Sequence, residues 1–224
     1  MRKVLINGAN GKMGQAIARL INEHAELELE VSVLREAGQN VTAPFDVIID
    51  FSSPQGAQEA FAIAKHAKKP FLTGTTNLTD LFLFQMQEET KIPVFFAPNV
   101  SLSVYFFTEL VKQAAKMYKN YEVALHEIHH IHKKDAPSGT AKRLADAVRM
   151  PYEKVTYERI GEVVGTHGVS FKSDLDEITL THKATNRDLF ARSALDIALW
   201  LMKQTGGFYT MSDYAKSKLK EKEK

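Results

Sequence analysis

The amino terminus of this chain passes from a short apolar strand, through a glycine-rich turn, into a helix. Residues 3–6 form the strand, and Gly8, Gly11 and Gly14 set a G-x-x-G-x-x-G spacing before the amphipathic residues 15–23. Glycines permit a tight turn and close approach of a pyrophosphate to the N–H groups at a helix start. A glycine match alone is weak, but strand–turn–helix is the context that makes it informative. We predict a dinucleotide-binding fold whose cofactor-binding residues in this segment are Gly8, Asn10, Gly11, Lys12, Met13 and Gly14.

The second predicted strand, residues 30–34, ends in Arg35 and Glu36. An acidic residue at this position binds a ribose hydroxyl of NADH, whereas an arginine suits the 2′-phosphate of NADPH. Arg35 therefore favours NADPH as the cofactor. A solvated charge pair at a strand end explains the same dipeptide equally well, so the sequence leaves the choice between NADPH and NADH open.

Three further apolar strands end in small or hydroxyl-bearing residues. Residues 46–51 lead into a Ser-Ser-Pro turn and a helix over 55–66, residues 70–72 lead into 73–76, and residues 93–97 lead into 98–99. Near-continuous apolar strands are typical of a parallel sheet covered on both faces, and ligands bind at the carboxyl ends of such strands. The predicted cofactor contacts at these ends are Phe51, Ser52, Gly74, Thr75, Thr76, Ala97 and Asn99.

The pattern changes after Asn99, where the α/β alternation stops. A helix over 102–118 and strands over 121–131, 155–160, 169–171 and 177–182 indicate an α+β domain with an open mixed sheet. The alternation in 177–181 predicts one apolar face, which a second copy of the chain could cover. We expect an α/β protein with a Rossmann-like dinucleotide-binding domain, residues 1–100 completed by 188–224, and a substrate-binding and oligomerisation domain, residues 101–187. A last helix over 191–203 would pack on the first domain.

The most unusual stretch of the chain is residues 127–141, which contains three histidines and two lysines within six positions. In a strand over 121–131, His126, His130 and His132 would share one face and His129 the other. A turn before Pro137 would then be needed to bring Lys133 near His129. Ser138 is a good N-cap for a helix over 140–148, whose free N–H groups would hold a carboxylate or phosphate. Proton donors beside an anion site predict chemistry on a small acidic molecule.

Two alternatives remain for this stretch. The four histidines (His126, His129, His130 and His132) could be metal ligands, although their spacing matches no zinc pattern and the chain has no cysteine. We therefore assign no metal. Ser138 could also be only a helix cap.

Composition narrows the class of protein. The net charge of +2 gives no sign of a nucleic-acid partner, and no apolar run approaches membrane-spanning length. The absence of cysteine excludes disulfides and thiol catalysis, and it fits a cytoplasmic location. The lysine-rich tail, residues 216–224, is expected to be a frayed, solvated end.

Together these residues resemble the dihydrodipicolinate reductase family, also called 4-hydroxy-tetrahydrodipicolinate reductases, along nearly the whole chain. The most specific match is His129-His130-Ile131-His132-Lys133 followed by Asp135-Ala136-Pro137-Ser138-Gly139-Thr140-Ala141. Supporting matches are residues 8–14, 50–52, 74–76 and 97–99, with Arg159-x-Gly161-x-x-x-Gly165-x-His167 and Thr181-His182-Lys183-Ala184.

The resemblance implies an NADPH- or NADH-dependent reductase of lysine and diaminopimelate biosynthesis, acting on a cyclic dicarboxylate imine. By similarity, His129 is the general acid and Lys133 its cationic partner. Substrate carboxylates would be held by His130, Ser138, Gly139 and Thr140, and Gly74 and Thr76 would lie near the nicotinamide. Family members are typically homotetramers built through their C-terminal sheets.

The chain departs from the family pattern at the hinge, where Ser103 and Tyr105 replace a glycine and an asparagine, and it is shorter before Phe45. Two other classes compete with the reductase: a different dehydrogenase on the same architecture, and a nucleotide-sensing protein without activity. The histidine segment weighs against both.

Overall fold

The computed structural model describes residues 1–24 and 29–222 and divides the chain into two units. Unit 1 comprises Met1–Ser101 and Asp188–Lys224, and unit 2 comprises Leu102–Arg187. Unit 1 contains β1 (Arg2–Asn7), α1 (Lys12–Glu23), β2 (Leu29–Arg35), β3 (Val47–Asp50), α2 (Pro54–Ala67), β4 (Phe71–Thr73), α3 (Asp80–Gln87), β5 (Pro93–Phe96), α6 (Asp188–Leu201), β10 (Gly207–Tyr209) and α7 (Met211–Lys222). Unit 2 contains α4 (Leu102–Met117), β6 (Glu122–His129), α5 (Gly139–Val148), the 3₁₀ turn η2 (Tyr152–Lys154), β7 (Thr156–Arg159), β8 (Gly165–Lys172) and β9 (Glu177–Ala184).

The sheet of unit 1 is parallel throughout, with strand order β10-β5-β4-β3-β1-β2. The chain moves outward in one direction from β1 to β2 and in the other from β3 to β5, so the order reverses between β1 and β3. In open α/β sheets the carboxyl ends of the strands at such a switch point form the ligand crevice. The glycine-rich turn follows β1 and therefore lies at this position.

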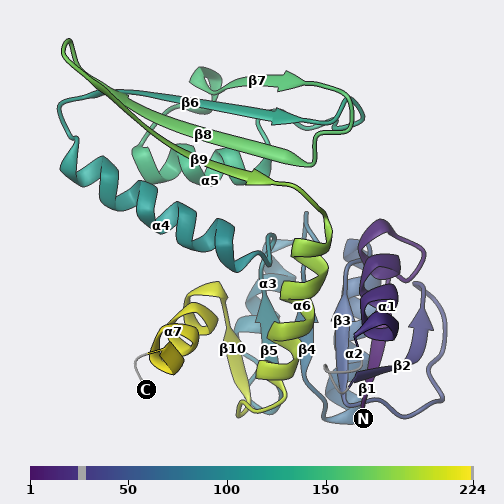
Figure 1. Cartoon of the computed structure of the whole chain (residues 1–224). Helices are drawn as coiled ribbons and strands as arrows, with labels where there is room; N and C mark the ends of the chain where they lie inside the picture. The colour runs from purple at the N-terminus through teal and green to yellow at the C-terminus, as the bar shows by residue number, and fades with distance from the viewer. Residues whose placement is uncertain (25–28, 223–224) are drawn as a thin grey trace. The chain divides into compact units, whose positions relative to one another are not determined.

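Helices cover both faces of this sheet (Figure 1). On one face, Phe61 of α2 and Phe82 of α3 pack against Phe71 and the neighbouring strand residues. On the other face, α1 and α6 pack together, and Trp200 of α6 meets Phe95 edge to face. Because helices cover both faces of the sheet, both sides of its strands are buried, and the strand sequences are therefore continuous apolar runs.

The carboxyl-terminal segment differs from the prediction. Residues 211–222 form α7 rather than a frayed end, because Met211, Tyr214 and Ala215 are buried at helical spacing. Residues 223–224 lie outside the described part of the chain. Before α7, the short strand β10 pairs in parallel with β5 and becomes the edge of the sheet; neither element was expected.

Unit 2 is a mixed four-stranded sheet, ordered β7-β6-β8-β9, with α4 and α5 against one face (Figure 1). Its apolar core joins Phe107 and Val111 of α4 and Leu144 of α5 to Val169 and Phe171 of β8. The prediction that a second copy covers this apolar face is wrong, because the chain's own two helices cover it. The opposite face carries small and polar residues (Ala124, Thr166, Ser170, Thr179 and Thr181). The predicted fold class, Rossmann-like with an α+β unit, is confirmed.

Candidate active site

The glycine-rich turn of unit 1 is built so closely that side chains cannot fit at two of its glycines. Gly8 has φ +84°, and a Cβ there would lie 2.3 Å from the carbonyl oxygen of Phe51. A Cβ on Gly14 would lie 2.3 Å from the carbonyl oxygen of Gly8. No side chain caps α1, whose N-cap is Gly11. The N–H groups of Lys12, Met13 and Gly14 in its first turn are therefore placed to meet an anion.

A buried carboxylate supports the carboxyl ends of the neighbouring strands. Asp50, at the end of β3, accepts hydrogen bonds from Asn7 at 2.7 Å and Ser52 at 2.5 Å on one oxygen, and from Thr73 at 2.6 Å and Thr75 at 2.8 Å on the other. All four donors come from the ends of strands or the loops after them. A fully buried carboxylate without hydrogen-bond donors would raise the free energy of the folded protein. The four hydrogen bonds therefore hold the loops after β1, β3 and β4 in place. Asn7 and Asp50 were not among the predicted site residues.

The other predicted contacts at these strand ends differ in exposure. Phe51 lies against Gly74, where a Cβ would meet its ring at 2.1 Å. Thr75 is buried, and its hydroxyl oxygen accepts a hydrogen bond from the Ser52 backbone at 2.9 Å. Thr76 is exposed after β4. After β5, Ala97 is buried and Asn99 accepts a hydrogen bond from the Ser101 backbone.

Arg35 does not occupy the position predicted for a contact to a 2′-phosphate. Its side chain is 3% exposed, and the guanidinium donates to Asn7, to Glu59 at 2.7 Å and to the Gln39 carbonyl oxygen at 2.9 Å. The group is thus held inside unit 1 rather than solvated or offered to a ligand. The expectation fails because the sequence does not show that Glu59 of α2 lies across from the end of β2.

Glu36 lies at the surface instead. Its carboxylate accepts a hydrogen bond from the Asn10 backbone N–H at 2.7 Å. It lines a hollow of about 430 Å³ with Ala9, Asn10, Gln15, Ala18, Leu34 and Gln39. Glu36 therefore lies beside the glycine-rich turn, whereas the Arg35 side chain is buried inside unit 1.

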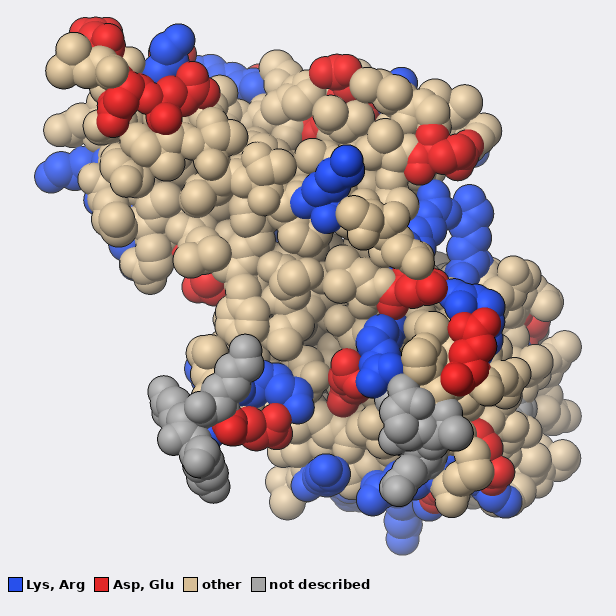
Figure 2. Space-filling model, in the orientation of Figure 1, with Lys and Arg blue, Asp and Glu red and all other residues tan. Residues whose placement is uncertain are grey.

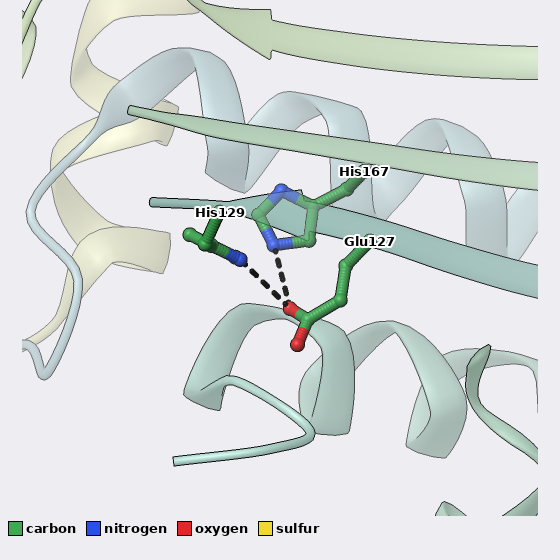
Figure 3. A group of neighbouring side chains, drawn as sticks. All are labelled: Glu127, His129 and His167. Atoms are coloured by element: carbon green, nitrogen blue, oxygen red, sulfur yellow. Dashed lines mark ion pairs between the residues drawn. The ribbon is translucent and has the colours of Figure 1, made fainter. Parts of the chain in front are cut away.

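In unit 2, three side chains meet on the covered face of the sheet: Glu127, His129 and His167 (Figure 3). Glu127 and His129 are two residues apart on β6 and so share a face, while His167 of β8 lies directly across from Glu127. One Glu127 oxygen, Oε2, lies 3.3 Å from His129 Nδ1 and 3.5 Å from His167 Nε2. Glu127 is 0% exposed and His129 is 7% exposed.

The second Glu127 oxygen connects this cluster to the start of α5. Oε1 accepts from the backbone N–H of Ser138 at 3.0 Å and lies 3.3 Å from the guanidinium of Arg159. Ser138 is the N-cap of α5 as predicted: its hydroxyl oxygen accepts from the N–H of Ala141 at 3.1 Å. The same oxygen lies 3.2 Å from His167 Nε2. Because the Ser138 side chain is buried and engaged, it positions the helix rather than presenting a hydroxyl to a ligand.

Burial and charge act in opposite directions on the pKa values of this cluster. Burial alone would raise the pKa of Glu127, but interactions with the His167 imidazole and with the Ser138 hydroxyl and backbone N–H outweigh it and lower the pKa to about 2. Burial lowers the pKa of His129 to about 4; the negative charge of Glu127 raises it, and the charges of His167, Lys133 and Arg159 lower it. Glu127 is thus an anion at neutral pH, and His129 without a bound ligand is a neutral imidazole.

The chain turns after His129, as expected. β6 ends at this residue, and the N–H of Lys133 donates to the carbonyl oxygen of His130 at 3.1 Å. The turn brings Lys133 close enough to influence His129, and Lys133 forms an ion pair with Asp135 at 2.8 Å. His130 is half-buried, and Gly139 is exposed with no atom within 4 Å of an added Cβ. Thr140 follows in the first turn of α5.

The sequence reasoning assigned no role to Glu127, His167 or Arg159. The i, i+2 spacing of Glu127 and His129 in a strand was a usable signal. The pairing of β6 with β8 was not, because it joins residues about forty positions apart. The ligand atoms of Glu127, His129 and His167 lie within 4.8 Å of one another, as a metal site would require. Since Arg159 already places a positive charge on this carboxylate, we interpret the group as an ion-paired cluster.

Comparison with known proteins identifies the family. Residues 2–100 match the family model described as dihydrodipicolinate reductase, N-terminus, and residues 103–214 match the one described as dihydrodipicolinate reductase, C-terminus. The chain belongs to the dihydrodipicolinate reductase family. This confirms the resemblance predicted from the histidine segment and the glycine-rich turn.

Curated members of this family cover almost the same length. A 4-hydroxy-tetrahydrodipicolinate reductase of Campylobacter jejuni is 38% identical over 96% of this chain and 99% of its own. One of Xanthomonas campestris is 39% identical over 94% of this chain and 96% of its own. Among solved structures, a dipicolinate-bound dihydrodipicolinate reductase from Paenisporosarcina sp. TG-14 superposes with a TM-score of 0.73 at 19% identity, covering 94% of this chain and 97% of its own, and supports the fold.

Two surface properties complete the description. Among the described residues, no helix is long and apolar enough to cross a membrane. On the face drawn in Figure 2, the visible lysine and arginine side chains are interspersed with aspartate and glutamate rather than gathered into one extended basic field.

Proposed function

We propose that this chain reduces 4-hydroxy-tetrahydrodipicolinate to tetrahydrodipicolinate with NADH or NADPH, as a step of lysine and diaminopimelate biosynthesis. The observation that carries the proposal is the buried contact of the Glu127 carboxylate with the His129 imidazole, one hydrogen bond away from the capped start of α5. It places a proton-exchanging group beside a site suited to a carboxylate. The family names of the curated relatives support the reaction.

Unit 1 fits a dinucleotide on the evidence of its own backbone. Gly8 and Gly14 leave no room for side chains, and the uncapped start of α1 offers N–H groups to a pyrophosphate. Gly8, Gly11, Lys12, Met13 and Gly14 would hold the pyrophosphate. The loops fixed by Asp50 would hold the nicotinamide end through Gly74 and Thr76. The 4-hydroxyl group of the substrate would first leave as water, which gives a ring with a C3=C4 double bond conjugated to the imine. When bound, the cofactor would supply a hydride to ring carbon C4 of this dehydrated substrate.

Unit 2 would bind the dicarboxylate and supply the proton. Lys133, His130, Thr140 and the backbone at Gly139 would hold the carboxylates. His129 would give its proton to the ring nitrogen, which receives the displaced electrons. Two substrate carboxylates near His129 favour its charged form, so substrate binding should raise the pKa of His129 from its low value in the free protein. Holding both groups in place contributes much of the rate.

We expect NADH to be preferred over NADPH, the reverse of the preference that Arg35 suggested. Arg35 is buried, and the Glu36 carboxylate would bind ribose hydroxyls and repel a 2′-phosphate. A hydrogen bond to a charged group contributes about 1.5–3 kcal/mol, so Glu36→Gln should reduce the NADH/NADPH ratio of kcat/KM by about tenfold or more. Steady-state kinetics with both cofactors would measure it. Glu30→Gln, near the start of β2, is the matched control. A wild-type preference for NADPH would contradict this assignment.

The reaction itself is tested by a coupled assay. Dihydrodipicolinate synthase would form the substrate from pyruvate and aspartate semialdehyde, and this protein would be added with NADH or NADPH. Loss of reduced-nicotinamide absorbance that requires both proteins would establish the activity. Folded protein that binds nucleotide but gives no loss with either cofactor would instead indicate a nucleotide-sensing protein. A substrate panel would then test the other dehydrogenase activities.

The homotetramer implied by the resemblance and the cytoplasmic location suggested by the absence of cysteine stay predictions. The face of the unit 2 sheet that α4 and α5 do not cover, with Thr166, Ser170, Thr179 and Thr181, would be the contact between copies. Sedimentation equilibrium of the purified protein would give the oligomeric state.

A further inference from the structure

The Glu127 carboxylate has two different environments on its two oxygens. Oε1 is engaged by the Ser138 N–H and by Arg159. Oε2 faces two imidazoles, His129 Nδ1 at 3.3 Å and His167 Nε2 at 3.5 Å, without a hydrogen bond of good geometry in the described structure (Figure 3). A fully buried carboxylate oxygen without a hydrogen-bond donor destabilises the folded protein, unless a proton on one of the two imidazole rings points toward it.

The position of His129 is also fixed from its other side. Gly165 of β8 leaves only a narrow space beside this ring, since a Cβ there would lie 3.0 Å from His129 Nε2. The ring is therefore held between the Glu127 carboxylate at Nδ1 and the β8 backbone near Nε2. Which ring nitrogen carries the proton in a neutral histidine is set by the partner of the other nitrogen.

We propose that Glu127 is the positioning residue of this site: its carboxylate holds the proton of neutral His129 on Nδ1, leaves Nε2 to exchange a proton with the substrate, and stabilises the imidazolium that precedes proton transfer. Through Oε1 and the Ser138 N–H, the same carboxylate aligns the proton donor with the start of α5. This inference rests on the proposed function. In this proposal Glu127 does not itself touch the substrate, and His129, which does, is the tautomer with its proton on Nδ1.

The charges around His129 support this role for Glu127. The groups that act on it are Glu127 on its own strand, His167 on β8, Lys133 in the following turn and Arg159 at the end of β7. Asp135 neutralises Lys133 through their ion pair. Of these groups, only Glu127 raises the pKa of His129, whereas His167, Lys133 and Arg159 lower it. Removing the negative charge should therefore make the imidazolium harder to form.

The test compares two substitutions at one position. Glu127→Gln keeps the side-chain length and removes the charge, whereas Glu127→Asp keeps the charge. We expect Glu127→Gln to lower the midpoint of His129 titration, followed by NMR of the ring nitrogens, by one pH unit or more. It should reduce kcat at pH 7 at least tenfold with the KM for NADH unchanged. Glu127→Asp should restore the midpoint and part of kcat.

The matched control is Glu158→Gln on β7. Glu158 also pairs with a histidine, His126, at 3.0 Å, but both side chains are more exposed. Removing the negative charge of Glu158 should leave kcat unchanged. An unaltered His129 midpoint in Glu127→Gln, or equal loss of kcat in the Gln and Asp variants, would overturn the proposal in favour of a structural role.

If Glu127→Gln does not fold, the wild-type protein can still test the proposed tautomer of His129. Its ring-nitrogen shifts at pH 7 should show His129 protonated on Nδ1, and protonation on Nε2 would overturn the proposal. These spectra need no substrate or cofactor. Failure of the reductase assay would therefore remove the proposed function and leave the assignment of Glu127 separately testable.

Discussion

Replacing His129 with glutamine is expected to lower kcat by about 10²–10⁴-fold, the usual contribution of general acid catalysis. The affinity for NADH should change little, because His129 belongs to unit 2 and the proposed nucleotide contacts belong to unit 1. Steady-state kinetics and direct titration with NADH would separate the two effects. His126→Gln is the matched control: it removes a histidine from the same strand that points to the opposite face and pairs with Thr156 and Glu158. Unchanged turnover in His129→Gln would remove His129 from the acid role.

The same residue predicts how the rate depends on pH. In the free protein, burial lowers the pKa of His129 to about 4, so the protonated form decreases as pH rises above that value. Because kcat/KM reports free-enzyme ionisation and kcat reports that of the complex, kcat/KM should already fall with rising pH in the acid range. The decline in kcat should occur at higher pH, since the substrate carboxylates raise the pKa of His129. Coincident profiles would contradict this.

The second large effect is expected at Gly14. Replacing a helical glycine with alanine usually stabilises a protein by about 0.5–1 kcal/mol. Here the added Cβ would lie 2.3 Å from the Gly8 carbonyl oxygen and 2.7 Å from the Ala9 Cα, and backbone atoms cannot move aside without opening the turn. We therefore expect Gly14→Ala to be destabilising by about 1–3 kcal/mol and to weaken NADH binding about tenfold or more.

Calorimetry with and without NADH would measure both quantities for Gly14→Ala. The control is Gly168→Ala in β8, where the added atom would make an ordinary contact at 3.8 Å with Thr181. Equal Tm values and equal NADH affinities for Gly14→Ala and the wild type would contradict the close approach of this turn.

Local patterns predicted much of this molecule. The glycine-rich turn, the apolar strands and the Ser138 cap are each specified by residues within a few positions, and each agrees with the structure. β10 spans only three residues, and its place comes from pairing with β5, which lies far away in sequence. Residues 211–222 read as polar because lysines outnumber the buried Met211, Tyr214 and Ala215.

The site shows the same division between local and distant information. His129 and Lys133 belong to one contiguous segment and were predicted together. Arg35 was predicted to contact a phosphate because its true partner, Glu59, lies on another element. The ion pair between them joins β2 to α2 and cannot be seen in the local sequence. Likewise, Glu127 gains its importance from His167, which the pairing of β6 with β8 brings opposite it. Charges whose partners lie on other elements cannot be assigned from a strand end alone.

The division of unit 1 into two chain segments has a consequence for biosynthesis. On a ribosome, residues 1–101 emerge first, but α6 and β10, which cover and extend their sheet, emerge only after all of unit 2. Unit 2 is continuous and can therefore complete its core while the first sheet still lacks α6 and its edge strand β10. The nascent chain would expose the part of the strand face that α6 later covers until residues 188–201 have been synthesised. That interval is when the polypeptide would be most exposed to aggregation and most in need of chaperones.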